Sequence, residues 1–313
     1  RKVPACRNYC YIPGTKADKA MRILSLTTLF LAIAVLACEP AGQMAEKTET
    51  EAVHPKGALF IIGGGKRPPA LVQELVAVSG IDSSGYAVIL PMSSSEPDTA
   101  AHYAVRQFTE LGLPADRFRV YDFQPGERPA AAVDSLRDAT LIYITGGDQR
   151  KFMEVVEGNE LESAIRSAYE AGATIAGTSA GAAVMSETMI TGDEKKHPEY
   201  TGDFRTIEAD NLIYSSGLGL LPQAIVDQHF IYRMRMNRLI AAVLEQPGQI
   251  GVGIDESTAF IVEGEQRARV AGDWQVVVLR NPADSTRAQS GLLGGKGLEL
   301  SILLPGDTLL LAQ

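Results

Sequence analysis

Short apolar runs alternate with longer amphipathic segments between Gly57 and about residue 256. Near-continuous apolar strands separated by helices are typical of a parallel sheet covered by helices on both faces. In such sheets, catalytic and binding residues gather at the carboxyl ends of the strands. The pattern predicts strands at 58–62, 86–90, 118–123, 141–144 and 173–176, and helices at 71–78, 99–111 and 152–171, the last interrupted near Gly158.

The pattern changes after about residue 256, where short apolar strands are joined by turns. No linker separates this region from the preceding one, so residues 57–313 are expected to form one domain. The predicted fold class is α/β, a three-layer sandwich around a parallel sheet with a C-terminal antiparallel β extension. The strands of the extension are expected at 259–262, 268–270, 274–279, 298–304 and 308–311.

The first 56 residues contain a predicted export signal. Arg22 follows Met21 and precedes an apolar run over 23–37, which is short for a membrane-spanning helix. The run ends in Val35-Leu36-Ala37-Cys38, which resembles the lipobox of bacterial lipoproteins. A plain signal peptide or an uncleaved anchor is the alternative. We therefore expect a start at Met21, a leader over 1–38 that is lipidated at Cys38, a flexible tether over 39–56, and an exported periplasmic or cell-surface protein held at a membrane by its lipid.

Cysteine use and charge narrow the chemistry of the domain. All three cysteines (Cys6, Cys10 and Cys38) precede Glu39, which excludes a disulfide framework, a cysteine nucleophile and a thiolate metal site after it. The net charge is −9, and residues 1–37 hold six basic residues against one acidic, so the rest is more acidic still. An acidic domain argues against nucleic acid as a partner, because phosphate binding needs clustered Lys and Arg.

A serine in a glycine-flanked turn is the candidate nucleophile. Gly177-Thr178-Ser179-Ala180-Gly181 follows a predicted strand and precedes a plausible helix start. This strand-to-helix context is the one that a nucleophile elbow requires. The N–H group of Ala180, at the start of that helix, would then point toward a developing oxyanion. Packing of small residues at an ordinary turn is the alternative.

Elimination selects the base that such a serine needs. The chain has four histidines. His54 lies in the tether, His102 on a mostly surface-facing helix, and His197 in a polar loop before a proline. His229 alone follows an apolar strand, so it is the candidate general base. A hydrogen-bonded structural histidine is the alternative.

A carboxylate should orient the imidazole. The apolar segment 250–254 predicts another buried strand, and Asp255 and Glu256 follow it directly. Either carboxylate could serve, and a carboxylate at a strand end is also common as a turn former. The residues alone leave this choice open.

Three arginines and a glycine turn complete the candidate site. Arg233, Arg235 and Arg238 follow the histidine closely, and guanidinium groups bind carboxylates bidentately. They favour an anionic substrate group, or alternatively form a solvated basic face. Residues 146–149 (Gly-Gly-Asp-Gln) end a strand and open a helix, so N–H groups near Gly147 could complete an oxyanion hole and Gln149 could contact substrate.

The sequence contains neither a phosphate-binding loop nor a zinc-binding motif. Gly63-Gly64-Gly65-Lys66 is followed by arginine and lacks the spacing of a phosphate-binding loop. No histidine-rich or acidic spacing typical of zinc ligation occurs. We therefore expect no metal and no cofactor.

The motifs in this order resemble the cyanophycinases, of the serine peptidase family that also holds aspartyl dipeptidase E. The resemblance implies a fold related to class I glutamine amidotransferase domains, with serine in place of their cysteine. It implies a Ser179–His229–Glu256 triad, which settles the choice of carboxylate. The resemblance rests on residues 146–149, 177–182, 227–230 with the three arginines, and 253–259, and it implies that Gln149, Gln228, Arg233, Arg235 and Arg238 line the substrate pocket.

Cyanophycinases cut a storage polymer of aspartate that bears arginine on each β-carboxyl, and they release β-aspartyl-arginine. We expect this peptide or polymer substrate, and relatives imply a homodimer. An α-aspartyl dipeptidase or amidase on the same triad is one alternative. A non-enzymatic peptide-binding surface lipoprotein is the other.

Overall fold

The computed structural model describes residues 57–199, 204–264 and 267–311. The predicted leader with Cys38 and the predicted tether lie outside these residues. None of the helices in the described ranges combines the length and the apolar character needed to cross a bilayer.

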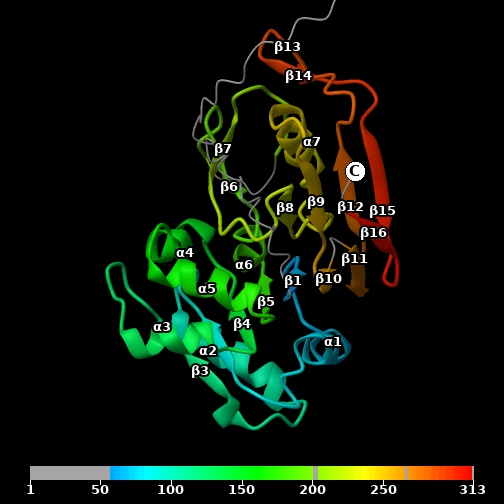
Figure 1. The fold of residues 1–313 in the computed structure, drawn as a ribbon. Helices are drawn as coiled ribbons and strands as arrows, with labels where there is room; N and C mark the ends of the chain where they lie inside the picture. The colour runs from blue at the N-terminus through cyan, green and yellow to red at the C-terminus, as the bar shows by residue number, and fades with distance from the viewer. Residues whose placement is uncertain (1–56, 200–203, 265–266, 312–313) are drawn as a thin grey trace, which may run out of the picture. The chain divides into compact units, whose positions relative to one another are not determined.

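The larger of the two main sheets has eight strands, in the order β16-β11-β10-β1-β5-β4-β2-β3 (Figure 1). Strands β1, β5, β4, β2 and β3 run parallel, and β10, β11 and β16 extend this sheet in antiparallel fashion beside β1. This arrangement confirms the predicted parallel sheet with its C-terminal antiparallel extension. The strands are β1 (Ala58–Ile62), β2 (Ala87–Leu90), β3 (Phe118–Val120), β4 (Leu141–Ile144), β5 (Thr174–Thr178), β10 (Thr258–Glu263), β11 (Arg267–Gly272) and β16 (Thr308–Leu310).

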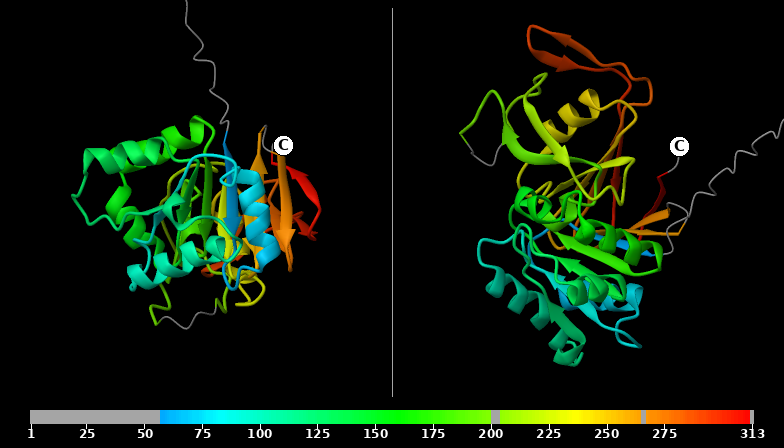
Figure 2. Two further views of the ribbon diagram at one scale, coloured as in Figure 1. Left: turned by 90° about the horizontal axis from the view of Figure 1, so that it is seen from below. Right: turned by 60° about the vertical axis from the view of Figure 1, so that its left-hand side comes forward.

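Helices cover both faces of this sheet (Figure 2). One face buries the apolar sides of α1 (Pro69–Ser79) and α2 (Pro97–Thr109), and the other packs against α3 (Ala130–Arg137), α4 (Gln149–Val156) and α5 (Glu160–Glu170). Residues 71, 72, 75 and 76 of α1 are buried, which is the spacing that places apolar side chains on one helical stripe. A short 3-10 helix, Ala115–Arg117, precedes β3.

A second sheet, in the order β15-β12-β9-β8, shares the core of the α3–α5 face. It consists of β8 (Ala224–Gln228), β9 (Ile250–Ile254), β12 (Val276–Arg280) and β15 (Glu299–Leu303), and α7 (Met236–Glu245) packs on it through Leu239 and Val243. The hydrophobic pattern indicates these strands but not that they form a sheet of their own. An apolar strand that is buried on both faces has the same hydrophobic pattern in either sheet.

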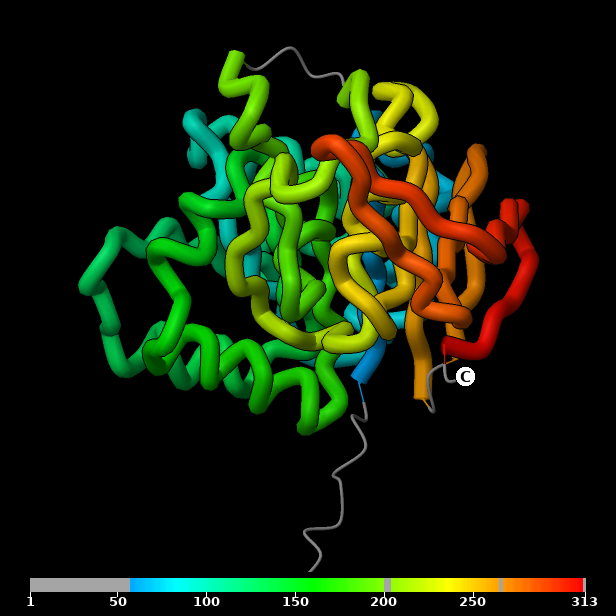
Figure 3. The backbone as a smooth tube through the Cα atoms, turned by 90° about the horizontal axis from the view of Figure 1, so that it is seen from above, coloured from blue at the N-terminus to red at the C-terminus, as the bar shows by residue number. Residues whose placement is uncertain are grey.

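The remaining elements are short. The helix α6 (Ala180–Ala183) follows β5, the strands β6 (Thr188–Glu194) and β7 (Leu212–Ser216) pair with each other, and β13 (Arg287–Gln289) pairs with β14 (Leu292–Gly294). In the tube of Figure 3 the β13–β14 segment, in orange-red, passes above the yellow strands of the second sheet. Four of these elements, β6, β7, β13 and β14, have no clear alternation of apolar and polar residues, so the sequence pattern misses them.

Candidate active site

Backbone hydrogen bonds join the ends of three strands at one place. The carbonyl of Ile62, the last residue of β1, accepts from Ser179 N at 3.0 Å. The next carbonyl, of Gly63, accepts from His229 N at 2.7 Å. Strand β8 is in turn parallel to β9, which ends just before Asp255. The two sheets therefore bring together the residues that follow β5, β8 and β9.

The backbone at Ser179 has a strained conformation. Ser179 lies between β5 and α6 with φ 54° and ψ −111°, which side-chain-bearing residues rarely adopt. His229 also has a positive φ, of 50°. Such conformations cost about 1–3 kcal/mol each and gather at functional sites. The expected strand-to-turn-to-helix elbow is present at Ser179.

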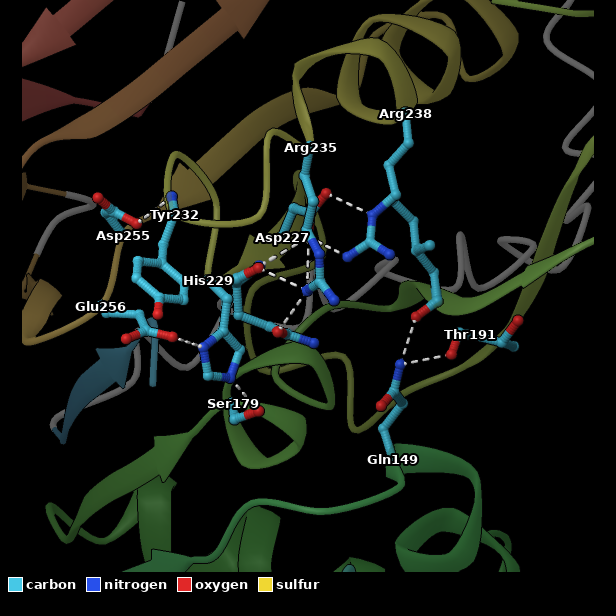
Figure 4. Close-up of polar contacts among 12 residues, drawn as sticks. Gln149, Ser179, Thr191, Asp227, His229, Tyr232, Arg235, Arg238, Asp255 and Glu256 are labelled. Atoms are coloured by element: carbon cyan, nitrogen blue, oxygen red, sulfur yellow. Dashed lines mark hydrogen bonds and ion pairs between the residues drawn. The ribbon is translucent and has the colours of Figure 1, made fainter. Parts of the chain in front are cut away.

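Ser179, His229 and Glu256 form one hydrogen-bonded chain (Figure 4). His229 Nε2 lies 2.9 Å from Ser179 Oγ, and His229 Nδ1 lies 2.6 Å from Glu256 Oε1. His229 is 7% exposed, whereas the serine and the glutamate are half-buried. This is the contact pattern that a hydroxyl nucleophile, its base and an orienting carboxylate require.

The neighbouring carboxylate has a different contact. Asp255 is buried and accepts a hydrogen bond from the backbone N–H of Tyr232 at 2.9 Å. It therefore holds the turn that follows His229, while Glu256 contacts the imidazole. The geometry separates two residues between which the residue pattern alone could not choose.

The environment of His229 favours the neutral form of its imidazole. Burial lowers the pKa of His229 below its usual value, and the positive charges of Arg233 and Arg235 act in the same direction. The bond to Glu256 opposes this shift. A neutral imidazole is the form that can accept a proton from a serine hydroxyl.

Gly147 and Ala180 lie beside the serine as the sequence predicts. Ala180 is the first residue of α6, so its N–H has no acceptor within the helix. Gly147 has φ 145°, and a Cβ there would stand 1.9 Å from Ser93 O. Only glycine therefore fits at 147 against the backbone of Ser93, and a Cβ on the preceding Gly146 would stand 3.2 Å from Ser179 Cβ.

A cavity of about 280 Å³ opens beside Ser179. It carries both signs of charge, and we call it the arginine pocket. It is lined by Gly147, Asp148, Gln149, Arg150, Ser179, Thr191, Gly192, Asp193, Gln228, Arg233, Arg235 and Arg238. Every predicted substrate-binding residue is thus among its walls.

Comparison with known proteins places this chain in a family. The model described as "Peptidase family S51" matches residues 59–270. The cyanophycinase of Nostoc sp. is 33% identical over 270 residues, which are 82% of this chain and 87% of the relative. The cyanophycinase of Geminocystis herdmanii is 33% identical over 228 residues, which are 70% of this chain and 80% of the relative. The chain belongs to peptidase family S51.

The resemblance drawn from the sequence is therefore confirmed, and the protein is a serine peptidase. A solved structure shares its fold: a peptidase from an acI-B1 actinobacterium superimposes with a TM-score of 0.61 at 21% identity. The match covers 82% of the S51 peptidase and 97% of that chain.

The three arginines of the S51 peptidase differ in what they contact. Arg238 is buried, and its guanidinium binds both carboxylate oxygens of Asp227 in a bidentate ion pair. Arg235, also buried, donates to the carbonyl and to Oε1 of Gln228. Arg233 is exposed, and no residue in the described ranges forms a hydrogen bond or ion pair with its side chain. All three line the cavity, but Arg235 and Arg238 are buried and held by protein partners, whereas Arg233 is exposed.

The two glutamines brace the wall of the arginine pocket. Gln149 is buried and donates from Nε2 to the carbonyls of Ile190 and Thr191, on β6 (Figure 4). Gln228 accepts from Arg235. Both line the cavity, and their amides hold neighbouring segments in position.

Three charged residues of the pocket, Asp148, Arg150 and Asp193, are not among the residues predicted from the sequence. Arg150 pairs with Asp148 at 3.0 Å and with Asp193 at 2.5 Å. The pocket therefore has two carboxylates on its α4 and β6 side, facing a cavity that also contains Arg233. Asp193 lies 45 residues beyond Asp148 in the sequence on an unpredicted strand, so only the fold reveals the pair.

The glycine run after β1 does not match a phosphate-binding loop, but it has a structural role at this site. A Cβ on Gly64 would stand 2.3 Å from His229 Cε1, and a Cβ on Gly65 would stand 2.8 Å from Glu256 Oε2. Both residues have a positive φ. The run allows the backbone to pass tightly against the histidine and the glutamate.

The other described histidines lie away from this site. His102 is exposed on α2, and His197 contacts Glu208 at 2.8 Å. Across the described ranges, no group of three or more His, Cys, Asp and Glu side chains is arranged to hold a metal ion.

Proposed function

We propose that this S51 peptidase cleaves cyanophycin-type aspartyl bonds and releases β-aspartyl-arginine, with Ser179, His229 and Glu256 as its triad. The observation that carries the proposal is the unbroken chain from Ser179 Oγ through both imidazole nitrogens to Glu256 Oε1. The identity of 33% to two cyanophycinases over most of the chain supports the choice of substrate.

The proposed reaction has two steps. Ser179 Oγ attacks the aspartyl carbonyl carbon while His229 Nε2 takes the hydroxyl proton. The carbon–nitrogen bond then breaks, and the imidazolium gives that proton to the leaving nitrogen. A water molecule next attacks the acyl-enzyme, His229 takes its proton, and Ser179 recovers it as the acid product leaves. Glu256 accepts the Nδ1–H bond throughout and stabilises the imidazolium.

Backbone N–H groups supply the proposed oxyanion hole. The Ala180 N–H opens α6, and the 146–147 turn passes beside Ser179. Two such donors stabilise the charge that develops on the carbonyl oxygen in the transition state.

The charges of the arginine pocket support a substrate that carries both signs. Exposed Arg233 suits a substrate carboxylate. Asp148 and Asp193, which pair with Arg150, lie where a substrate guanidinium could find carboxylate acceptors. An aspartyl unit that bears arginine carries both groups, whereas an unmodified α-aspartyl dipeptide carries no guanidinium unless its second residue supplies one.

The membrane anchor and the homodimer belong to the same proposal. A lipidated Cys38 would hold the enzyme outside the cytoplasm, where the polymer would be scavenged rather than drawn from the cell's own store. Labelling of wild-type and Cys38→Ala cells with a clickable fatty acid tests this step. A label that persists in the variant argues against it.

Digestion of purified cyanophycin with identification of the products tests the function. We expect β-aspartyl-arginine from the wild type, no product from Ser179→Ala, and full activity from Ser84→Ala, a matched change at an exposed serine. A fluorophosphonate probe should label the wild type and not Ser179→Ala. Labelling without cyanophycin cleavage would support Ser179 as the nucleophile but would contradict cyanophycin as the substrate. A panel of α- and β-aspartyl peptides would then identify the bond that is cleaved.

A further inference from the structure

A second cavity meets the serine from another side. It has a volume of about 340 Å³ and lies between the ends of β1, β4 and β5 and the helix α2. We call it the tyrosine pocket. Its side-chain walls include Arg67, Tyr103, Tyr143, Thr145, Thr178 and His229. Ser179 lines both this cavity and the arginine pocket.

The lining residues indicate which part of a substrate each cavity would hold. His229 lines the tyrosine pocket and not the arginine pocket, and Gly147 of the proposed oxyanion hole lines only the arginine pocket. In the proposed reaction the leaving nitrogen takes its proton from His229 Nε2. The proton donor thus borders the tyrosine pocket, which favours that side for the leaving group.

Two residues that line the tyrosine pocket have buried hydroxyls with no hydrogen-bond partner in the described ranges. Tyr143 Oη and Thr178 Oγ1 make no hydrogen bond within the described part of the chain, although their residues are only 1% and 6% exposed. The Tyr143 ring packs edge-on against Phe108, with 6.1 Å between ring centroids, so it is held inside. A buried hydroxyl without a partner costs about 1–3 kcal/mol. Such a cost is removed when a ligand brings a polar atom.

The charge of this pocket has one sign. Arg67 is held by bonds from Nε to Gln107 Oε1 at 2.6 Å and from Nη1 to the carbonyl of Gly65 at 3.2 Å. These contacts use two of the five N–H groups of a guanidinium. No Asp or Glu is among the described residues that line the cavity. The pocket thus offers a cation and two hydroxyl donors, which match a carboxylate.

We propose that the tyrosine pocket is the leaving-group subsite, in which Arg67, Tyr143 and Thr178 bind a carboxylate of the departing amine. This inference rests on the proposed triad and on the assignment of His229 as proton donor. It makes these three residues determinants of specificity. They contact the leaving group, whereas Arg233 contacts the acyl part of the substrate.

A matched pair of substrates tests the proposal. One is the dimer of β-aspartyl-arginine, and the other is the same dimer with both carboxylates of its leaving unit converted to carboxamides. We expect the wild type to favour the acid by about 10-fold or more in kcat/KM, as for a charge-assisted bond. Arg67→Gln should reduce the ratio to about one, while Lys66→Gln, an equal change of charge at an exposed neighbour, should keep it.

The hydroxyls are tested separately. Tyr143→Phe and Thr178→Val should each raise KM for the acid dimer about 3- to 10-fold with little change in kcat, as expected for a lost hydrogen bond. Unchanged KM values in both variants would show that the hydroxyls hold only water and would overturn their part of the proposal. A wild-type ratio near one, or a ratio retained in Arg67→Gln, would overturn the carboxylate subsite.

Failure of the proposed function is distinguishable from failure of the subsite. If the wild type is labelled by the fluorophosphonate but cuts neither dimer, the substrate is wrong. The subsite is then judged from binding of the acid and amide dimers to Ser179→Ala by calorimetry, with and without Arg67→Gln. Equal affinities for the two dimers in Ser179→Ala would overturn it.

Discussion

The two cavities that meet at Ser179 differ in how their polar side chains are satisfied. In the arginine pocket, Asp227 binds Arg238, and Gln228 binds Arg235. In the tyrosine pocket, the buried hydroxyls of Tyr143 and Thr178 have no hydrogen-bond partner among the described residues. Asp227 and Gln228, at the arginine pocket, therefore have protein partners before substrate arrives, whereas the two hydroxyls of the tyrosine pocket have none within the described part of the chain. The difference separates residues that shape the site from residues that should bind.

The buried ion pair behind the arginine pocket should give the largest change in stability. Arg238→Met removes the cation and leaves the carboxylate of Asp227, which is fully buried, without its bidentate partner. We expect a loss of about 3–5 kcal/mol in the free energy of unfolding. Chemical denaturation followed by circular dichroism measures it.

The double variant Asp227→Leu/Arg238→Met provides the control for that loss. It removes both charges together, so it should cost clearly less than the two single changes combined. If the loss in the double variant equals the sum of the two single losses, the two charges contribute independently. The contrast between the two cavities would then fail.

Arg233→Gln should affect activity far more than stability. Its side chain is exposed and has no described partner, so unfolding should change by no more than about 0.5 kcal/mol. Loss of a charge-assisted bond to substrate should lower kcat/KM by roughly 10- to 100-fold. Steady-state kinetics on cyanophycin fragments measures this effect. A variant that unfolds easily but binds substrate normally would place Arg233 with the structural arginines instead.

The pH dependence of the same variant should shift in a definite direction. The positive charge of Arg233 lowers the pKa of His229, so its removal should raise that pKa. Because the neutral imidazole is the proposed base, kcat/KM falls as pH falls through this pKa. The acid limb of the profile should therefore move to higher pH in Arg233→Gln and stay near the wild-type position in Arg233→Lys, which keeps the charge. An unmoved limb in Arg233→Gln would mean that the arginine does not act on the imidazole.

Some features of the protein can be predicted from the sequence, and others cannot. The parallel strands, the elbow at Ser179 and the choice of His229 follow from apolar periodicity and elimination, because each depends on local pattern. The contacts of Arg233, Arg235 and Arg238 do not, since the buried partner Asp227 lies 11 residues before Arg238 and on another element. Nor does the tyrosine pocket, whose walls come from α2, β4 and β5. Close packing between distant segments decides both, and periodicity carries no information about it.

The smallest expected effect is a difference in the free energy of unfolding between the Phe variants of two packed tyrosines, Tyr86 and Tyr143. Tyr86 donates a hydrogen bond to the carbonyl of Ser135 at 2.8 Å in a partly buried position. Tyr86→Phe removes this bond and should lower the free energy of unfolding by about 1 kcal/mol. The Tyr143 hydroxyl has no hydrogen-bond partner in the described part of the chain, so Tyr143→Phe should leave the free energy of unfolding unchanged or slightly higher. Urea denaturation of the two variants in the absence of substrate measures the difference. If Tyr143→Phe is destabilised as much as Tyr86→Phe, its hydroxyl is already satisfied in the free enzyme, and its contrast with the paired Asp227 and Gln228 at the arginine pocket would fail.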